Sequence, residues 1–305
     1  MAPLSPLALL LASGLAYHGH RKKSLSPSGS VTAFIVGYLM LSSTIWAFGV
    51  SLIAFYLIGS RATKFGKATK RRLESAYHEY GYRTGWQVIS NSFSALVACV
   101  LWNAIYAPDS LPGWVFGSLL SFPPTLSRPL LLLALGHFAC CLGDTLASEL
   151  GILAKGKPRL LLSRLSFLTP VPPGTNGALS FPGTAASLAG GAIMGFVMGV
   201  VLILENDVCR RDALGVVVEL ITIGGLCGFG GSLIDSILGA TLQETRYDAD
   251  RKVVISDGEG QVEVSGRTVN SLGSRADAHH SQPPPPTSSA SHSCRTTRLT
   301  WSAAS

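Results

Sequence analysis

The sequence predicts an all-α protein: a polytopic bundle of about six to seven transmembrane helices followed by a disordered C-terminal tail. Three observations favour this fold class. Hydrophobic residues make up 47% of the 305-residue chain and charged residues only 13%. The mean hydropathy is +0.37. Hydrophobic runs near the ~20 residues that a spanning helix needs recur along the chain. We therefore expect a lipid bilayer around this protein and no nucleic-acid partner.

Six hydrophobic segments are expected to form the helices, and they cover residues 4–17, 31–59, 86–107, 129–143, 178–204 and 213–233. The second segment is too long for one untilted helix and too short for two comfortable ones, so it crosses once or, as a tight hairpin, twice, which gives six or seven crossings. The first segment is short and could instead be the core of a signal peptide or a re-entrant piece. A signal peptide is disfavoured because residues 1–6 carry no basic side chain.

Basic residues predict the orientation of these helices. If residues 31–59 form a hairpin, fourteen basic residues fall on one side, and only Arg128, Arg210 and Arg211 fall on the other. The positive-inside rule then places the basic loops and the C-terminus in the cytosol. We expect the endoplasmic reticulum or another endomembrane, because no Arg- and Ser-rich transit peptide is evident. The fourteen residues are Arg21, Lys22, Lys23, Arg61, Lys64, Lys67, Lys70, Arg71, Arg72, Arg83, Lys155, Lys157, Arg159 and Arg164.

Changes in composition divide the chain into four regions. Residues 1–23 form a short hydrophobic segment with a basic loop, and residues 24–245 form the transmembrane domain. Residues 246–270 are a polar juxtamembrane segment. Residues 271–305 are rich in Ser, Pro and His and are expected to be disordered.

Three polar, glycine-rich motifs interrupt the hydrophobic segments: Gly143–Glu149 (GDTLASE), Pro172–Gly177 (PPGTNG) and Gly230–Ser236 (GGSLIDS). An acid at the end of a membrane helix is costly unless it meets a cation, a polar partner or water, so Asp144 and Asp235 are candidates for a functional site. Under the hairpin topology all three motifs face the cytosol beside the basic loops. We therefore expect them to converge.

These residue types suit phosphoryl transfer. One or two carboxylates can hold Mg²⁺ while substrate phosphates complete its coordination, a role that we predict for Asp144 and Asp235. Ser148 follows Asp144 at helical spacing and shares its face, whereas Glu149 points elsewhere unless the helix breaks. The second motif offers backbone N–H groups at a helix start, where anions are favoured, through Gly174, Thr175, Asn176 and Gly177. Lys157 or Arg159 is expected to offset developing charge.

Each feature also has a structural interpretation. Basic loops serve as topology determinants in any inserted membrane protein. The two acids could pair with arginine or cap loops. Glycines at positions 190, 191, 224, 225, 228, 230 and 231 could simply let helices pack closely.

The motifs together resemble the transmembrane protein 19 family over residues 22–255. Beside the three motifs, the resemblance includes Lys23–Gly29, Thr32–Gly37, Gly59–Lys64, Gln87-Val88 with Asn91, and the pattern Gly231–Gln243. The plant and cyanobacterial branch of this family contains phytyl-phosphate kinase, which converts a prenyl monophosphate to the diphosphate. By this resemblance Thr145, Ser236 and Gln243 join the substrate-binding positions, and Glu149 becomes a third candidate ligand of Mg²⁺. The chain departs from the family after residue 255, where relatives continue into an Asp-Asn-Asn segment and a final hydrophobic helix.

Two functional hypotheses remain. The first is a phosphoryltransferase that uses a nucleoside triphosphate and an isoprenoid alkyl monophosphate. The second is a transporter or permease, motivated by Glu219 within a hydrophobic segment and by glycine-interrupted helices. A membrane protein without enzymatic activity is a third interpretation, which no specific motif favours.

Overall fold

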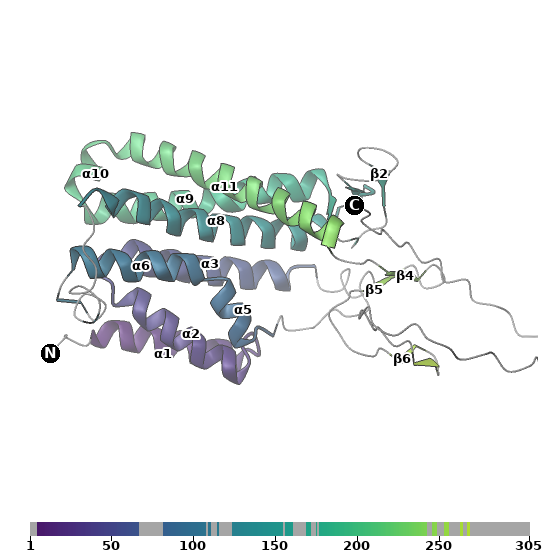
Figure 1. The fold of residues 1–305 in the computed structure, drawn as a ribbon, viewed down its shortest axis with the longest axis horizontal. Helices are drawn as coiled ribbons and strands as arrows, with labels where there is room; N and C mark the ends of the chain where they lie inside the picture. The colour runs from purple at the N-terminus through teal and green to yellow at the C-terminus, as the bar shows by residue number, and fades with distance from the viewer. Residues whose placement is uncertain are drawn as a thin grey trace, which may run out of the picture.

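The computed structural model shows an elongated bundle of helices lying side by side (Figure 1). It describes residues 5–66, 82–107, 109–110, 115, 124–154, 156–160, 169–171, 175, 177–242, 246–248, 253–255, 263–264 and 267–268. Most of these residues are helical, which confirms the predicted helical bundle. The predicted disordered tail at 271–305 lies outside the described residues.

The helices follow the predicted hydrophobic segments closely. They are α1 (Pro6–Arg21), α2 (Pro27–Leu41), α3 (Trp46–Lys64), α5 (Gly85–Ser90), α6 (Phe93–Tyr106), α8 (Ser127–Gly151), α9 (Phe181–Glu205), α10 (Asp207–Arg211) and α11 (Ala213–Leu242), with a 3-10 turn, η1, at Pro124–Leu126. Among the described residues, α3, α8, α9 and α11 are long and apolar enough to cross a membrane, whereas α2 and α6 are shorter apolar helices. By this criterion the predicted six to seven crossings are not confirmed.

The long segment at residues 31–59 divides into two helices, in line with the hairpin alternative. Helix α2 ends at Leu41 and α3 begins at Trp46. Asn103 of α6 holds the turn between them: its Nδ2 donates to Ser43 Oγ at 2.9 Å, and its Oδ1 accepts from the backbone N–H of Thr44 at 3.3 Å. The Asn103 side chain is fully buried. Its two hydrogen bonds connect α6 to the turn between α2 and α3.

Replacing Asn103 by alanine is expected to destabilise the bundle by about 1–2 kcal/mol, because its buried hydrogen bonds to Ser43 and Thr44 are lost. Thermal unfolding in detergent measures this effect. Thr241→Ala is the matched control, since the Thr241 hydroxyl donates only within its own helix in the described structure, at 2.8 Å to Ile237 O. Equal melting temperatures for the two variants would contradict this role of Asn103.

Helices α8, α9 and α11 pack against one another through glycines. A Cβ added to Gly143 of α8 would lie 2.7 Å from Gly228 Cα of α11, and one added to Gly190 of α9 would lie 3.1 Å from Gly143 Cα. Gly191 and Gly224 face each other in the same way, backbone against backbone. Close approach also explains Gly228 and Gly231, whereas an added Cβ at Gly225 would make only ordinary contacts from 3.5 Å and one at Gly230 would meet nothing within 4 Å.

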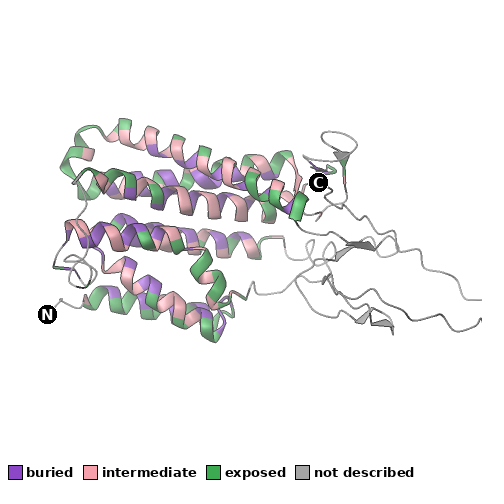
Figure 2. Cartoon of the chain, in the orientation of Figure 1, coloured by how far each residue is buried: buried purple, intermediate pink, exposed green. Residues whose placement is uncertain are grey.

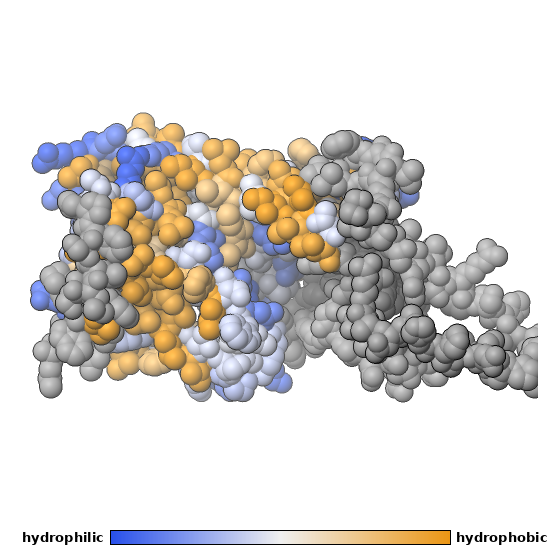
Figure 3. All heavy atoms as spheres, in the orientation of Figure 1, coloured by the Kyte–Doolittle hydropathy of each residue, from blue (hydrophilic) through white to orange (hydrophobic). Residues whose placement is uncertain are grey.

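Large side chains fill the remaining core between α3, α8 and α9, and the buried positions follow the inner faces of the helices (Figure 2). Phe48, Phe138, Leu135, Met194 and Met198 are fully buried. The outer faces carry exposed Leu, Ile, Val and Phe. Figure 3 shows these hydrophobic residues over the sides of the helices, with hydrophilic residues near α10 and the α1–α2 turn. Such an apolar belt suits contact with lipid.

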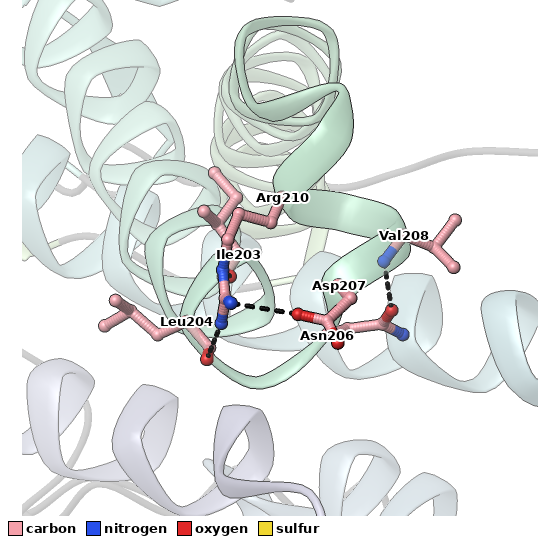
Figure 4. Close-up of polar contacts among 6 residues, drawn as sticks. All are labelled: Ile203, Leu204, Asn206, Asp207, Val208 and Arg210. Atoms are coloured by element: carbon pink, nitrogen blue, oxygen red, sulfur yellow. Dashed lines mark hydrogen bonds and ion pairs between the residues drawn. The ribbon is translucent and has the colours of Figure 1, made fainter.

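The α9–α10 turn closes one end of the bundle (Figure 4). The Arg210 guanidinium donates to Leu204 O at 2.8 Å, to Ile203 O at 3.2 Å and to Asp207 Oδ1 at 2.9 Å. The first two acceptors are carbonyls from the last turn of α9, where a cation is favoured by the helix dipole. Arg210 therefore satisfies backbone groups that have no partner within the helix.

Short strands add a small departure from the all-α prediction. Strands β1 (Arg159–Leu160), β2 (Thr169–Pro170) and β3 (Ala178–Leu179) form an antiparallel sheet in the order β2-β1-β3, with Arg159 opposite both Pro170 and Leu179. Two hairpins lie in the segment predicted to be polar and juxtamembrane: β4 (Arg246–Asp248) pairs with β5 (Val253–Ile255), and β6 (Glu263–Val264) with β7 (Arg267–Thr268). The β1 sheet lies at the end of the bundle opposite α10 (Figure 1).

Candidate functional site

An open cavity of about 210 Å³ lies where α8 and α11 end and α9 begins. Its lining combines acidic, hydroxyl and glycine residues. Six residues predicted for the site line it: Asp144, Ser148, Thr175, Gly177, Asp235 and Ser236. All three motifs contribute to the cavity, as expected from the hairpin topology.

Helix α8 supplies one wall. Asp144, Ser148 and Gly151 follow one another at helical spacing, and all three line the cavity. The Ser148 hydroxyl donates to the backbone carbonyl of Asp144 at 3.1 Å. A Cβ on Gly151 would lie 3.3 Å from Gly183 Cα, so the glycine lets α9 begin directly beside the end of α8.

Helix α11 supplies the opposite wall through Ser232, Asp235, Ser236 and Gly239. Asp235 is exposed and lies close enough to Asp144 for the two carboxylates to repel each other, and the Ser232 hydroxyl is a hydrogen-bond partner of Asp144. Sequence reasoning missed Ser232. Its spacing of three residues before Asp235 places both on one helix face, and this spacing could have identified it.

The start of α9 closes the cavity. Ser180 is the N-cap, and its hydroxyl accepts from the N–H of Gly183 at 3.2 Å. Gly177 has a φ of +74°, and a Cβ there would clash with the backbone of α11 at Ser236 and Ala240, so only glycine fits. The positive end of the α9 dipole therefore faces a cavity that also holds two acids. Ser180 and Thr184 are further lining residues that the motifs did not predict.

Other predicted residues lie elsewhere. The Thr145 hydroxyl donates to Cys141 O at 2.7 Å, and its methyl group faces Gly59 of α3. Glu149 does not line the cavity and lies near Arg83, because α8 continues unbroken to Gly151 and turns this side chain away. In the described part of the chain no group of three His, Cys, Asp or Glu residues could hold a metal ion, so the predicted ligand set with Glu149 is not assembled.

The predicted cations lie beside the cavity and do not line it. Lys157 and Arg159 are exposed and alternate with Gly156 and Pro158, which do line it. The remaining predicted positions, Gly174, Asn176 and Gln243, lie outside the described residues.

Glu219, the acid that motivated the transporter hypothesis, forms an ion pair with Arg128. Arg128 begins α8 and Glu219 lies in the first half of α11, so the pair belongs to the half of the bundle away from the cavity. A neighbouring arginine accounts for the acid without a transported solute.

The fold and the cavity define a helical integral membrane protein with an acid-lined site at one end of its bundle. The model of the family described as integral membrane protein DUF92 matches residues 10–278. This chain belongs to that family, which confirms the resemblance seen in the motifs.

Relatives occur in plants and cyanobacteria. The chain is 35% identical over 260 residues to Protein PGR of Arabidopsis thaliana, covering 85% of this chain and 86% of that protein. It is 31% identical over 230 residues to the uncharacterized membrane protein sll0875 of Synechocystis, covering 73% of each. It is 29% identical over 223 residues to Protein VTE6, chloroplastic, of Arabidopsis thaliana, covering 72% of this chain and 57% of that protein. No solved structure matches the chain.

Proposed function

We propose that this protein is a membrane phosphoryltransferase that moves the terminal phosphate of a nucleoside triphosphate onto an isoprenoid alkyl monophosphate. The observation that carries the proposal is the convergence of Asp144 and Asp235, from two different helices, on one cavity at the start of α9. The motif resemblance to a family whose plant branch contains phytyl-phosphate kinase supports the substrate class.

The residues that line the cavity fit Mg²⁺. Two carboxylates and several hydroxyls form an all-oxygen set of donors, and Mg²⁺ typically takes one or two carboxylates and completes its coordination with substrate phosphates and water. The repulsion between Asp144 and Asp235 is the kind of interaction that a divalent cation relieves. These two residues would hold the ion, which when bound would neutralise charge on the phosphates.

The rest of the cavity would position the phosphates. Thr175 and Thr184 line the cavity with hydroxyl groups, and the positive end of the α9 dipole favours an anion there. An oxygen of the acceptor monophosphate attacks the terminal phosphorus of the nucleotide, and the bond from that phosphorus to the bridging oxygen breaks, releasing the nucleoside diphosphate. The acceptor is already an anionic nucleophile, so the reaction needs no strong general base.

Phosphate transfer by the purified protein in lipid nanodiscs tests the proposal. We expect labelled phosphate to move from a terminally labelled nucleoside triphosphate to a prenyl monophosphate, and a chelator of divalent cations to stop the transfer. A prenyl alcohol is the control acceptor, since it lacks the phosphate nucleophile. Absence of prenyl diphosphate across a panel of nucleotides and prenyl monophosphates would overturn the assignment.

The double variant Lys157→Gln, Arg159→Gln is expected to lower kcat/KM by about tenfold at low ionic strength and to change kcat little. Both side chains are exposed beside the cavity, so they attract a polyphosphate without touching the reacting atoms, and salt screens that attraction. Initial rates at low and high salt measure the effect. A lower kcat at saturating substrate would instead mean that one of them contacts the transferred phosphate.

A further inference from the structure

A second cavity lies on the other side of the bundle, among α1, α2, α3 and α5. It has a volume of about 80 Å³ and is lined mainly by small and aliphatic side chains, among them Ala12, Ala33 and Val36. Its lining along α2 runs from Ala33 to Leu41, which corresponds to roughly 12 Å of helix rise. The lining therefore extends along about two turns of α2.

One charged side chain, Arg83, contributes to this apolar lining. Its backbone is fixed at the α1–α2 turn, because Arg83 N donates to Ser24 O at 3.0 Å and Ser26 N donates to Arg83 O at 2.9 Å. Its guanidinium reaches α3, where Nη1 donates to Ser60 Oγ at 3.3 Å. The side chain thus closes the cavity at the same end of the bundle as the acid-lined site.

The environment of Arg83 suits an anion. Burial lowers the pKa of its guanidinium, and the nearby Tyr56 and Glu149 only oppose this shift. A guanidinium has five N–H donors in a planar fork that matches phosphate and carboxylate, so one hydrogen bond to Ser60 does not exhaust it. A buried positive charge is costly unless it is paired, so an anion bound beside it would stabilise it.

We propose that this second cavity binds an anionic single-chain amphiphile from the membrane, with its alkyl chain between α1, α2 and α3 and its phosphate or carboxylate head on Arg83. The apolar lining suits an alkyl chain, and Arg83, the one charged residue in the lining, suits a negative head group. Helix α8 separates the two cavities: Asp144 and Ser148 line the first, whereas Thr145 and Glu149 lie on the side of Gly59 and Arg83.

This site is distinct from the proposed reaction centre and requires neither nucleotide nor metal. Its existence does not depend on the proposed function. The variant Asp144→Asn is accordingly expected to bind the amphiphile like the wild type, whatever its phosphoryltransferase activity.

Photolabelling of the full chain in phosphatidylcholine nanodiscs tests the inference. The probes are hexadecyl monophosphate, palmitate and hexadecyltrimethylammonium, each with the same diazirine in its chain, and labelled peptides are identified by mass spectrometry. We expect the phosphate or the palmitate probe to label α1, α2 or α3 at the cavity, and comparison of the two tells which head group is preferred. The ammonium probe is expected to label these helices about tenfold less.

Two pairs of variants distinguish a specific loss of amphiphile binding from a general loss of the fold. Arg83→Gln is expected to reduce labelling by about tenfold, with the exposed Arg61→Gln of α3 as its control. Ala33→Phe puts a bulky ring into the cavity lining and is expected to block labelling, with the exposed Ala189→Phe of α9 as its control. Equal labelling by the anionic and cationic probes, or undiminished labelling of Ala33→Phe, would overturn the proposal.

Discussion

Replacing Asp144 or Asp235 by asparagine is expected to lower the rate of phosphoryl transfer by roughly 100-fold or more, the scale seen when one group that stabilises transition-state charge is removed. Asparagine keeps the size of the side chain and its oxygen but removes the charge that would hold Mg²⁺. Single-turnover rates with the labelled nucleotide measure the loss.

The same substitutions are expected to leave the fold intact or to stabilise it slightly, because they relieve the repulsion between the two carboxylates. Activity and melting temperature would then change independently, which a purely structural role for these acids does not predict. Asp207→Asn is the matched control, since Asp207 is an exposed acid at the opposite end of the bundle. Wild-type turnover in both cavity variants would remove the basis of the proposed function.

Replacing Gly224 by alanine is expected to cost about 3 kcal/mol of stability, near the upper end of the penalty for overpacking. A Cβ at this position would overlap the backbone of α9 at Gly191, and a backbone cannot move aside as a flexible side chain can. Helices α9 and α11 would have to separate along their contact. The yield of monodisperse protein and its thermal unfolding in detergent measure the effect.

Gly230→Ala on the same helix is the control for this substitution. An added Cβ there meets nothing within 4 Å, so we expect this variant to stay within about 1 kcal/mol of the wild type. If the two variants proved equally stable, close packing at Gly224 would not be what holds α9 and α11 together.

Helical periodicity and the motifs predicted most of the acid-lined cavity. The spacing of Asp144, Ser148 and Gly151 placed them on one face, and alternating crossings brought Asp235 to the same end. Both inferences need only local geometry and the number of segments between the motifs. The length of residues 31–59 allowed one helix or two, and the placement of basic residues favoured the hairpin.

Long-range contacts were not predictable in this way. The pairing of Arg128 with Glu219 depends on how α8 packs beside α11, and no local pattern records that packing. Glu149 turned away from the cavity because α8 continues to Gly151, whereas a break after the motif would have redirected it. The small β1 sheet also escaped the sequence analysis, since its strands are only two residues long and carry no alternating pattern.

Gly177 and the end of α11 bear on how this protein is made. The loop before α9 rests on the backbone of α11 at Ser236 and Ala240, and α11 also supplies one of the two acids of the cavity. During synthesis α8 and α9 leave the ribosome first, and α11 is the last of the described helices to follow. Until it inserts, Asp144 has neither Ser232 nor Asp235 beside it. The cavity is therefore completed only when α11 inserts, and a nascent chain that stops before α11 cannot contain it.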